Sequence, residues 1–152
     1  MWFRNLQLYR LGQVFDLTPE TLHDRLQAQA FQGVSRMDMA TSGWVPPLGR
    51  YSELLVHATD ACMMICLRKG EKLMPASVVN QLLDDRVAEI EAAEAREVVR
   101  RERRRLKEES IVDLLPRALT RHTDLFAYGA SRTGRVVVVS PTASWAEDLI
   151  GP

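Results

Sequence analysis

The sequence contains little cysteine, no long apolar run and no net charge, and each absence excludes a class of protein. Two cysteines in 152 residues cannot form a disulfide scaffold, so the stability of the fold must come from packing. The longest apolar stretches, near 61–67 and 136–139, are far shorter than the ~20 residues that span a bilayer. No charged leader followed by an apolar run is visible, so we expect a cytoplasmic protein that contacts no membrane. Lysine plus arginine and aspartate plus glutamate number 20 each, which excludes a bulk basic protein but not a local cationic cluster.

The apolar residues form short alternating runs and a few helical repeats, which favour a mixed fold. Thr18, Pro19 and Glu20 are typical of a helix start, with a hydroxyl cap, a proline in the first turn and an acid near the positive helix end. Pro46 and Pro47 force an extended path. We therefore expect an α+β fold, a small antiparallel sheet packed with helices. The predicted strands are 2–11, 53–59, 61–68, 125–128 and 135–140, and the predicted helices run from Thr18 to Gly33 and from Ser144 onward.

Glycine and proline are absent between Pro75 and Pro116, and this segment is predicted to be helical. A continuous helix of that length would extend about 60 Å at 1.5 Å per residue, whereas a compact domain of this size measures about 35 Å. We expect the segment either to project as a long helical arm or to fold back as a hairpin that breaks near Ser110. The predicted organisation is an α/β body at 1–74 and 121–152, with the helical arm inserted at 75–120.

Charge is distributed in blocks along the predicted arm. Between 84 and 94 five acids accompany one base, whereas between 96 and 107 seven bases accompany two acids. Guanidinium groups suit bidentate contact with phosphate, so the second block predicts sequence-independent binding to the DNA backbone. The alternative is a solvated helix face balanced by Glu97 and Glu102. On a continuous helix, four bases fall within an arc of about 60° and a fifth lies beside it: Arg96, Arg100, Arg103 and Lys107, then Arg104.

No combination of residues typical of catalysis or metal binding is found. His23, His57 and His122 have no sequence neighbours that would complete a nucleophilic or metal site. Cys62 and Cys66 have the spacing of one strand face and are interpreted as reduced, buried thiols. We expect no enzyme, no metal site and no cofactor.

Several short segments of unusual composition occur at defined spacings along nearly the whole chain. They are Trp2-Phe3-Arg4-Asn5-Leu6, Tyr9-Arg10-Leu11, Asp38-Met39-Ala40, Gly43-Trp44-Val45-Pro46-Pro47, Ile65-Cys66 with Arg68-Lys69, Glu71-Lys72 with Pro75, and Leu114-Leu115-Pro116-Arg117-Ala118. In these segments the sequence resembles the family of the recombination-associated protein RdgC. Family members are about twice as long, so the resemblance implies that this chain is the N-terminal half of a longer protein.

The resemblance implies a nucleoid-associated protein that binds double-stranded DNA without sequence preference. In the family, two subunits close a ring around the duplex and restrain the RecA recombinase by competing for DNA, and the full ring also needs the C-terminal half. The helical tip makes one ring contact, which implies a homodimer contact at Leu119, and Arg117 matches an arginine associated with DNA binding. With Arg121 just beyond, the predicted DNA-binding residues are Arg96, Arg100, Arg103, Arg104, Lys107, Arg117 and Arg121.

A second function stays open from the residues themselves. Apolar positions continue at helical spacing along one face of the predicted arm, and such a face is typical of helix pairing. The arm would then be a protein-interaction or dimerisation module with no direct DNA contact. The residues of this face are Val79, Leu83, Val87 and Ile90.

Overall fold

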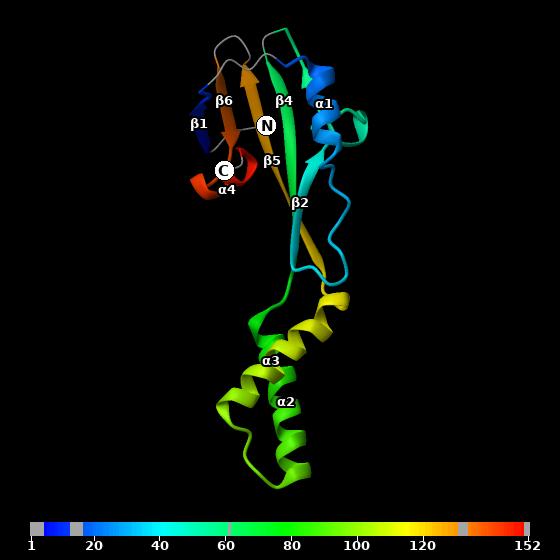
Figure 1. Cartoon of the computed structure of the whole chain (residues 1–152), viewed down its shortest axis with the longest axis vertical. Coiled ribbons are helices and arrows are strands. Elements are labelled where there is room, and N and C mark those ends of the chain that lie inside the picture. Colours follow the sequence, from blue (N-terminus) through cyan, green and yellow to red (C-terminus); the bar gives the residue numbers. More distant parts are fainter. Residues whose placement is uncertain (1–4, 13–16, 61, 131–133, 151–152) are drawn as a thin grey trace. The chain divides into compact units, whose positions relative to one another are not determined.

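The computed structural model describes residues 5–12, 17–60, 62–130 and 134–150 (Figure 1). Within these ranges the chain forms four α-helices and a six-stranded sheet, which confirms the predicted α+β fold. No helix of the described segments is both long enough and apolar enough to cross a membrane. The elements in chain order are β1 (Leu6–Arg10), α1 (Pro19–Gln27), β2 (Ala40–Val45), the 3₁₀ helix η1 (Gly49–Tyr51), β3 (His57–Ala58), β4 (Met63–Lys72), α2 (Ala76–Glu94), α3 (Arg100–Leu114), the 3₁₀ helix η2 (Leu115–Arg117), β5 (Thr120–Ala130), β6 (Arg135–Val139) and α4 (Ala143–Ile150).

The sheet has the strand order β1-β6-β5-β4-β2, and β3 pairs with β4 outside that path. Strands β5 and β6 form the predicted antiparallel hairpin, in which Phe126 lies opposite Val139. Strand β1 pairs antiparallel with the other edge of β6, so that Leu6 also lies opposite Val139 (Figure 1). Residues 2–4 of the expected first strand lie outside the described residues.

The prediction of a strand at 53–59 is wrong for most of that segment. Among its residues, only His57–Ala58 pairs with β4. Leu55 and Val56 are consecutive and both buried, so this segment does not alternate between two faces as a strand would. The backbone N–H of Leu55 donates to Nδ1 of His23 at 3.1 Å rather than to a neighbouring strand. Strand β4 is correspondingly longer than the predicted 61–68.

Helix α1 begins where the sequence predicts. Thr18 is the N-cap, and its Oγ1 accepts a hydrogen bond from the backbone N–H of Thr21 at 3.2 Å. This bond satisfies one of the free N–H groups of the first turn. The predicted end at Gly33 is wrong, since the helix ends at Gln27.

The residues after α1 pair with β2 instead of extending the helix. The N–H of Trp44 donates to the carbonyl of Gln29 at 3.0 Å, and the N–H of Phe31 donates to the carbonyl of Trp44 at 2.9 Å. Gly43 permits this approach, because a Cβ there would lie 2.5 Å from Cα of Phe31. A local helical pattern is therefore overridden by backbone pairing with a segment distant in sequence.

The chain divides into two compact units. Unit 1 comprises Met1–Gly33, Ser42–Lys69 and His122–Pro152, and unit 2 comprises Val34–Thr41 and Gly70–Arg121. Helices α1 and α4 belong to unit 1, whereas α2, α3 and η2 belong to unit 2. Unit 1 is held by two apolar clusters that share Trp44 and Ile65 as partly buried neighbours. Their buried members are Leu67, Leu125, Ala127, Val138, Ala146 and Leu149 in one, and Leu22, Leu26, Leu55, Val56 and Met63 in the other.

Unit 2 is built on a hairpin of α2 and α3, which pack beside each other (Figure 1). The predicted break near Ser110 is wrong, because the chain reverses at 95–99 and Ser110 lies inside α3. Ala95 makes the reversal possible by adopting a left-handed conformation, with φ 50° and ψ 40°. Three of the four residues predicted to pair with another arm, Leu83, Val87 and Ile90, pack inside this hairpin. Its core is Leu83, Val87 and Leu106, with Ile90 and Val98 packed against it.

Candidate nucleic-acid interface

Helix α3 is positioned by its contact with α2, which leaves most of its circumference free. Leu106 is 6% exposed and packs on α2, and one turn later Ser110 is fully buried. The Ser110 Oγ donates to the carbonyl of Leu106 at 2.7 Å, which satisfies the buried hydroxyl within the helix. The buried stripe fixes which way the remaining side chains point, and half of the exposed side chains of α3 are arginine.

Four cations of α3 line a single groove beside α2, which we call the α3 basic groove. At 100° per residue these four positions lie within an arc of about 100° on one side of the buried stripe. The volume of the groove is about 440 Å³, and the only acid among its described lining residues is Asp84. The lining residues are Asn80, Leu83, Asp84, Arg100, Arg103, Arg104 and Lys107.

The four cations differ in how far they are neutralised by neighbouring acids. Within the described part of the chain, Arg100 and Lys107 form no ion pair. Arg103 forms an ion pair with Asp84 across the groove. Arg104 pairs with Glu108 at 3.4 Å, and both side chains are largely exposed, so this pair contributes little to stability. The groove therefore keeps a clear positive charge.

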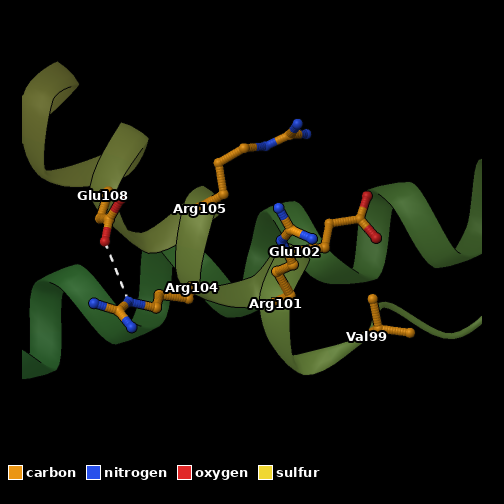
Figure 2. A pocket seen from close by; sticks show the side chains of 6 residues that line it. All are labelled: Val99, Arg101, Glu102, Arg104, Arg105 and Glu108. Atoms are coloured by element: carbon orange, nitrogen blue, oxygen red, sulfur yellow. Dashed lines mark hydrogen bonds and ion pairs between the residues drawn. The ribbon is translucent and has the colours of Figure 1, made fainter.

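A second groove lies on another side of α3 and is shown in Figure 2. Figure 2 shows the Arg104 and Arg105 side chains leaving the helix in different directions, because consecutive helical residues are about 100° apart. The groove holds about 650 Å³ and carries three bases and two acids, so its charge is weaker than that of the α3 basic groove. Its lining residues are Val99, Arg101, Glu102, Arg104, Arg105 and Glu108.

Arg101 and Arg105 are accessible cations that the sequence reasoning did not assign to the site. Both are exposed, and Arg105 pairs with Glu109 at 3.3 Å. On a helical wheel of α3, both positions lie about 60° or more from the positions that line the α3 basic groove. They serve as the natural comparison for the α3 basic groove, because they belong to the same helix.

Arg96 is not part of α3, so the prediction that it shares a helical stripe with Arg100 is wrong. It lies in the connection at 95–99, where its Nε donates to Glu94 at 2.5 Å. Its two terminal nitrogens donate to the carboxylate of Glu102 at 2.8 and 2.9 Å. The hydrogen bonds with Glu102, and then those with Glu94, raise the pKa of the Arg96 guanidinium, and the same contact lowers the pKa of the Glu102 carboxyl. Arg96 thus stabilises the reversal between the helices.

The two remaining predicted cations lie outside the α3 basic groove. Arg117 is exposed at the end of η2 and forms no ion pair among the described residues. Arg121 lies at the start of β5 and pairs with Glu71 at 2.9 Å. The structure therefore brings four of the seven predicted DNA-binding residues into one groove and places three elsewhere.

Leu119, the predicted dimer contact, is 76% exposed. It borders a largely apolar groove of about 220 Å³ within unit 2, which we call the Leu119 groove. Val78 and Leu73 in the same groove are also exposed, at 47% and 42%. Such a concentration of exposed apolar side chains is typical of an interaction surface. The lining residues are Leu73, Met74, Pro75, Val78, Val79, Leu114, Arg117, Ala118 and Leu119.

Within residues 5–12, 17–60, 62–130 and 134–150, no three side chains of histidine, cysteine, aspartate or glutamate lie close enough together to hold a metal ion.

The family model and the curated relatives that match this chain point to the same family. The family model described as "RdgC: Putative exonuclease, RdgC" matches residues 1–151. The recombination-associated protein RdgC of Tolumonas auensis is 37% identical over 150 residues, covering 99% of this chain and 50% of that protein. Those of Aeromonas hydrophila and Halorhodospira halophila are 39% and 41% identical, with the same share of this chain and 50% and 49% of their own lengths. The chain thus spans about half the length of the curated relatives it matches.

Proposed function

The chain belongs to the RdgC family, and from this premise we propose that it binds the phosphate backbone of double-stranded DNA without regard to sequence. The observation that carries the proposal is the α3 basic groove, where the described lining residues include four cations and one acid. From Arg100 to Lys107 the helix rises about 10 Å, which matches the axial length of about three phosphates of one strand. Cations in this arrangement contact phosphate oxygens, which every sequence presents alike.

The proposal is tested by measuring binding to two unrelated duplexes of equal length over a series of salt concentrations. We expect equal affinities and a binding constant that falls steeply with salt, because each phosphate contact releases a counterion. Affinities that differ by more than tenfold between the two duplexes, or that do not respond to salt, would contradict backbone binding.

The family model carries the word exonuclease, whereas the curated relatives are named for recombination. Our proposal assigns binding without cleavage, because the groove presents arginine and lysine, which hold phosphate but do not activate water. Incubation of linear and supercoiled plasmid with the protein and magnesium distinguishes the two. We expect intact DNA, and progressive shortening of the linear form would establish exonuclease activity instead.

In the cell, the same binding would associate the protein with the nucleoid and limit the access of a recombinase to DNA. Support for this step comes from the relatives' name, which associates them with recombination. Strand exchange by a purified RecA recombinase should slow when the protein is added to the duplex first. A variant with Arg100→Gln and Lys107→Gln should have a much smaller effect, and equal inhibition by both forms would show that the groove is not responsible.

A second candidate function is dimerisation through the Leu119 groove. The apolar face of α2 no longer supports it, since Leu83 and Val87 are buried against α3. The specific observation in its favour is Leu119, whose side chain is 76% exposed in an apolar groove. Sedimentation of the wild type and of Leu119→Asp, each with and without a short duplex, separates the candidates. Dimers that dissociate in the variant support pairing, and sedimentation that never responds to duplex would leave pairing as the sole function.

A further inference from the structure

Among the described residues, Asp84 is the one carboxylate that lines the α3 basic groove, and its side chain lies beside the cations. It follows Leu83, which is buried in the core of the hairpin, so packing fixes Asp84 at the edge of the interface between the helices. From there its carboxylate pairs with Arg103 of α3, nineteen residues later in the chain. The acid is therefore held in the groove by the fold.

The pair between Asp84 and Arg103 is accessible to an incoming phosphate. The two side chains are 62% and 46% exposed, so neither is locked inside the protein. Exposed ion pairs of this kind contribute little to stability and exchange readily for another anion. A phosphate entering the groove would meet Arg100 and Lys107 without internal partners, but would have to replace the carboxylate at Arg103.

We propose that Asp84 acts as a built-in competitor for phosphate, which holds the affinity of the groove for DNA below the value that its four cations would give. This inference rests on the proposed function, because it concerns the same groove. Its consequence is a protein that binds duplex DNA reversibly and releases it readily as salt rises. Asp84 is thus a residue that sets affinity through Arg103, without contacting DNA itself.

The test compares Asp84→Asn with Asp85→Asn in equilibrium binding to one duplex at low and at moderate salt. Asp85 is exposed, forms no ion pair among the described residues and does not line the groove, so both variants lose one negative charge from neighbouring positions of α2. We expect Asp84→Asn to bind about two- to fivefold more tightly than Asp85→Asn at low salt, the range given by the strength of an exposed ion pair.

The role of Arg103 is examined in a double-mutant cycle. In an Arg103→Gln background, Asp84→Asn should no longer raise affinity, because the cation that it releases is gone. Thermal unfolding of each variant shows whether the hairpin is intact, and an Asp84→Ser variant should reproduce the gain if Asn itself disturbs α2.

The outcomes are distinct. A wild-type protein that binds no duplex would refute the proposed function itself and, with it, this role of Asp84. A wild type that binds, together with equal affinities for Asp84→Asn and Asp85→Asn, would refute the competitor role alone. A gain that persists unchanged without Arg103 would likewise overturn it.

Discussion

The α3 basic groove makes a quantitative prediction about salt. If each of its four cations meets one phosphate, the logarithm of the binding constant falls by about 3.6 for each tenfold rise in salt, since each contact contributes about 0.9. A fourfold rise in salt should therefore weaken the wild type about 150-fold. Replacing Arg100 and Lys107 by glutamine removes the two cations of the groove that form no ion pair in the described ranges. The slope should fall to about 1.8, and the same rise in salt should weaken the variant only about 12-fold.

The matched control removes two cations from the second groove of the same helix. Arg101→Gln with Arg105→Gln changes the net charge by the same amount but leaves the four groove cations in place. We expect its slope to stay within about 0.5 of the wild type, because screened charges outside the contact release few counterions. Fluorescence anisotropy with a labelled duplex measures both slopes. Equal losses in the two double variants would show that total charge, rather than the α3 basic groove, determines binding.

Three further predictions concern the fold that positions the groove. Ala95→Gly should stabilise the protein by about 1 kcal/mol in urea unfolding, because glycine adopts the left-handed conformation at φ 50° without the strain of a side chain; an unchanged midpoint would argue against this reversal. Gly43→Ala should destabilise by about 1–3 kcal/mol, since the new Cβ meets backbone atoms at 2.5 Å, and a neutral effect would mean that this pairing is loose. Burial raises the pKa of the Cys66 thiol to about 12, so this thiol stays protonated at pH 8.5. Iodoacetamide should therefore label the half-buried Cys62 in the folded protein, whereas Cys66 should react only after unfolding. Labelling of both thiols at one rate in the folded protein would contradict the burial of Cys66.

The parts of the fold that the sequence predicted well depend on local interactions. The start of α1 at Thr18 and the hairpin of β5 and β6 follow from a capping hydroxyl and from alternating branched residues, and both are confirmed. The end of α1 could not be predicted locally, because Trp44, far along the chain, pairs with the backbone of Gln29 and Phe31.

The reversal of the helical hairpin was not predicted, because no single residue type in the sequence indicates it. Neither glycine nor proline marks it, and Ala95 adopts a conformation that costs about 1–2 kcal/mol for a residue with a side chain. Contacts across the turn help to fix this conformation. Arg96 binds Glu94 and Glu102, and the N–H of Val98 donates to Glu91 at 2.9 Å.

This same reversal explains what the sequence could and could not predict about the site. The spacing of Arg100, Arg103, Arg104 and Lys107 lies within α3, so a helical pattern was sufficient to group them. Arg96 was grouped with them only because the helix was taken as continuous. The pairing of Arg103 with Asp84 depends on how α2 packs against α3, which no pattern along one helix reveals.

Protection of Lys107 by DNA tests the central claim most directly. The sequence has three lysines, and only Lys107 lies in the α3 basic groove. Lys69, which pairs with Asp148 at 3.3 Å, and Lys72, whose Nζ lies 3.5 Å from a backbone carbonyl, are internal references. Acetylation of the protein with and without saturating duplex, read by mass spectrometry, should show that Lys107 becomes severalfold less reactive while Lys69 is unchanged. If Lys107 reacts equally fast when the protein is fully bound to DNA, the α3 basic groove does not hold the duplex.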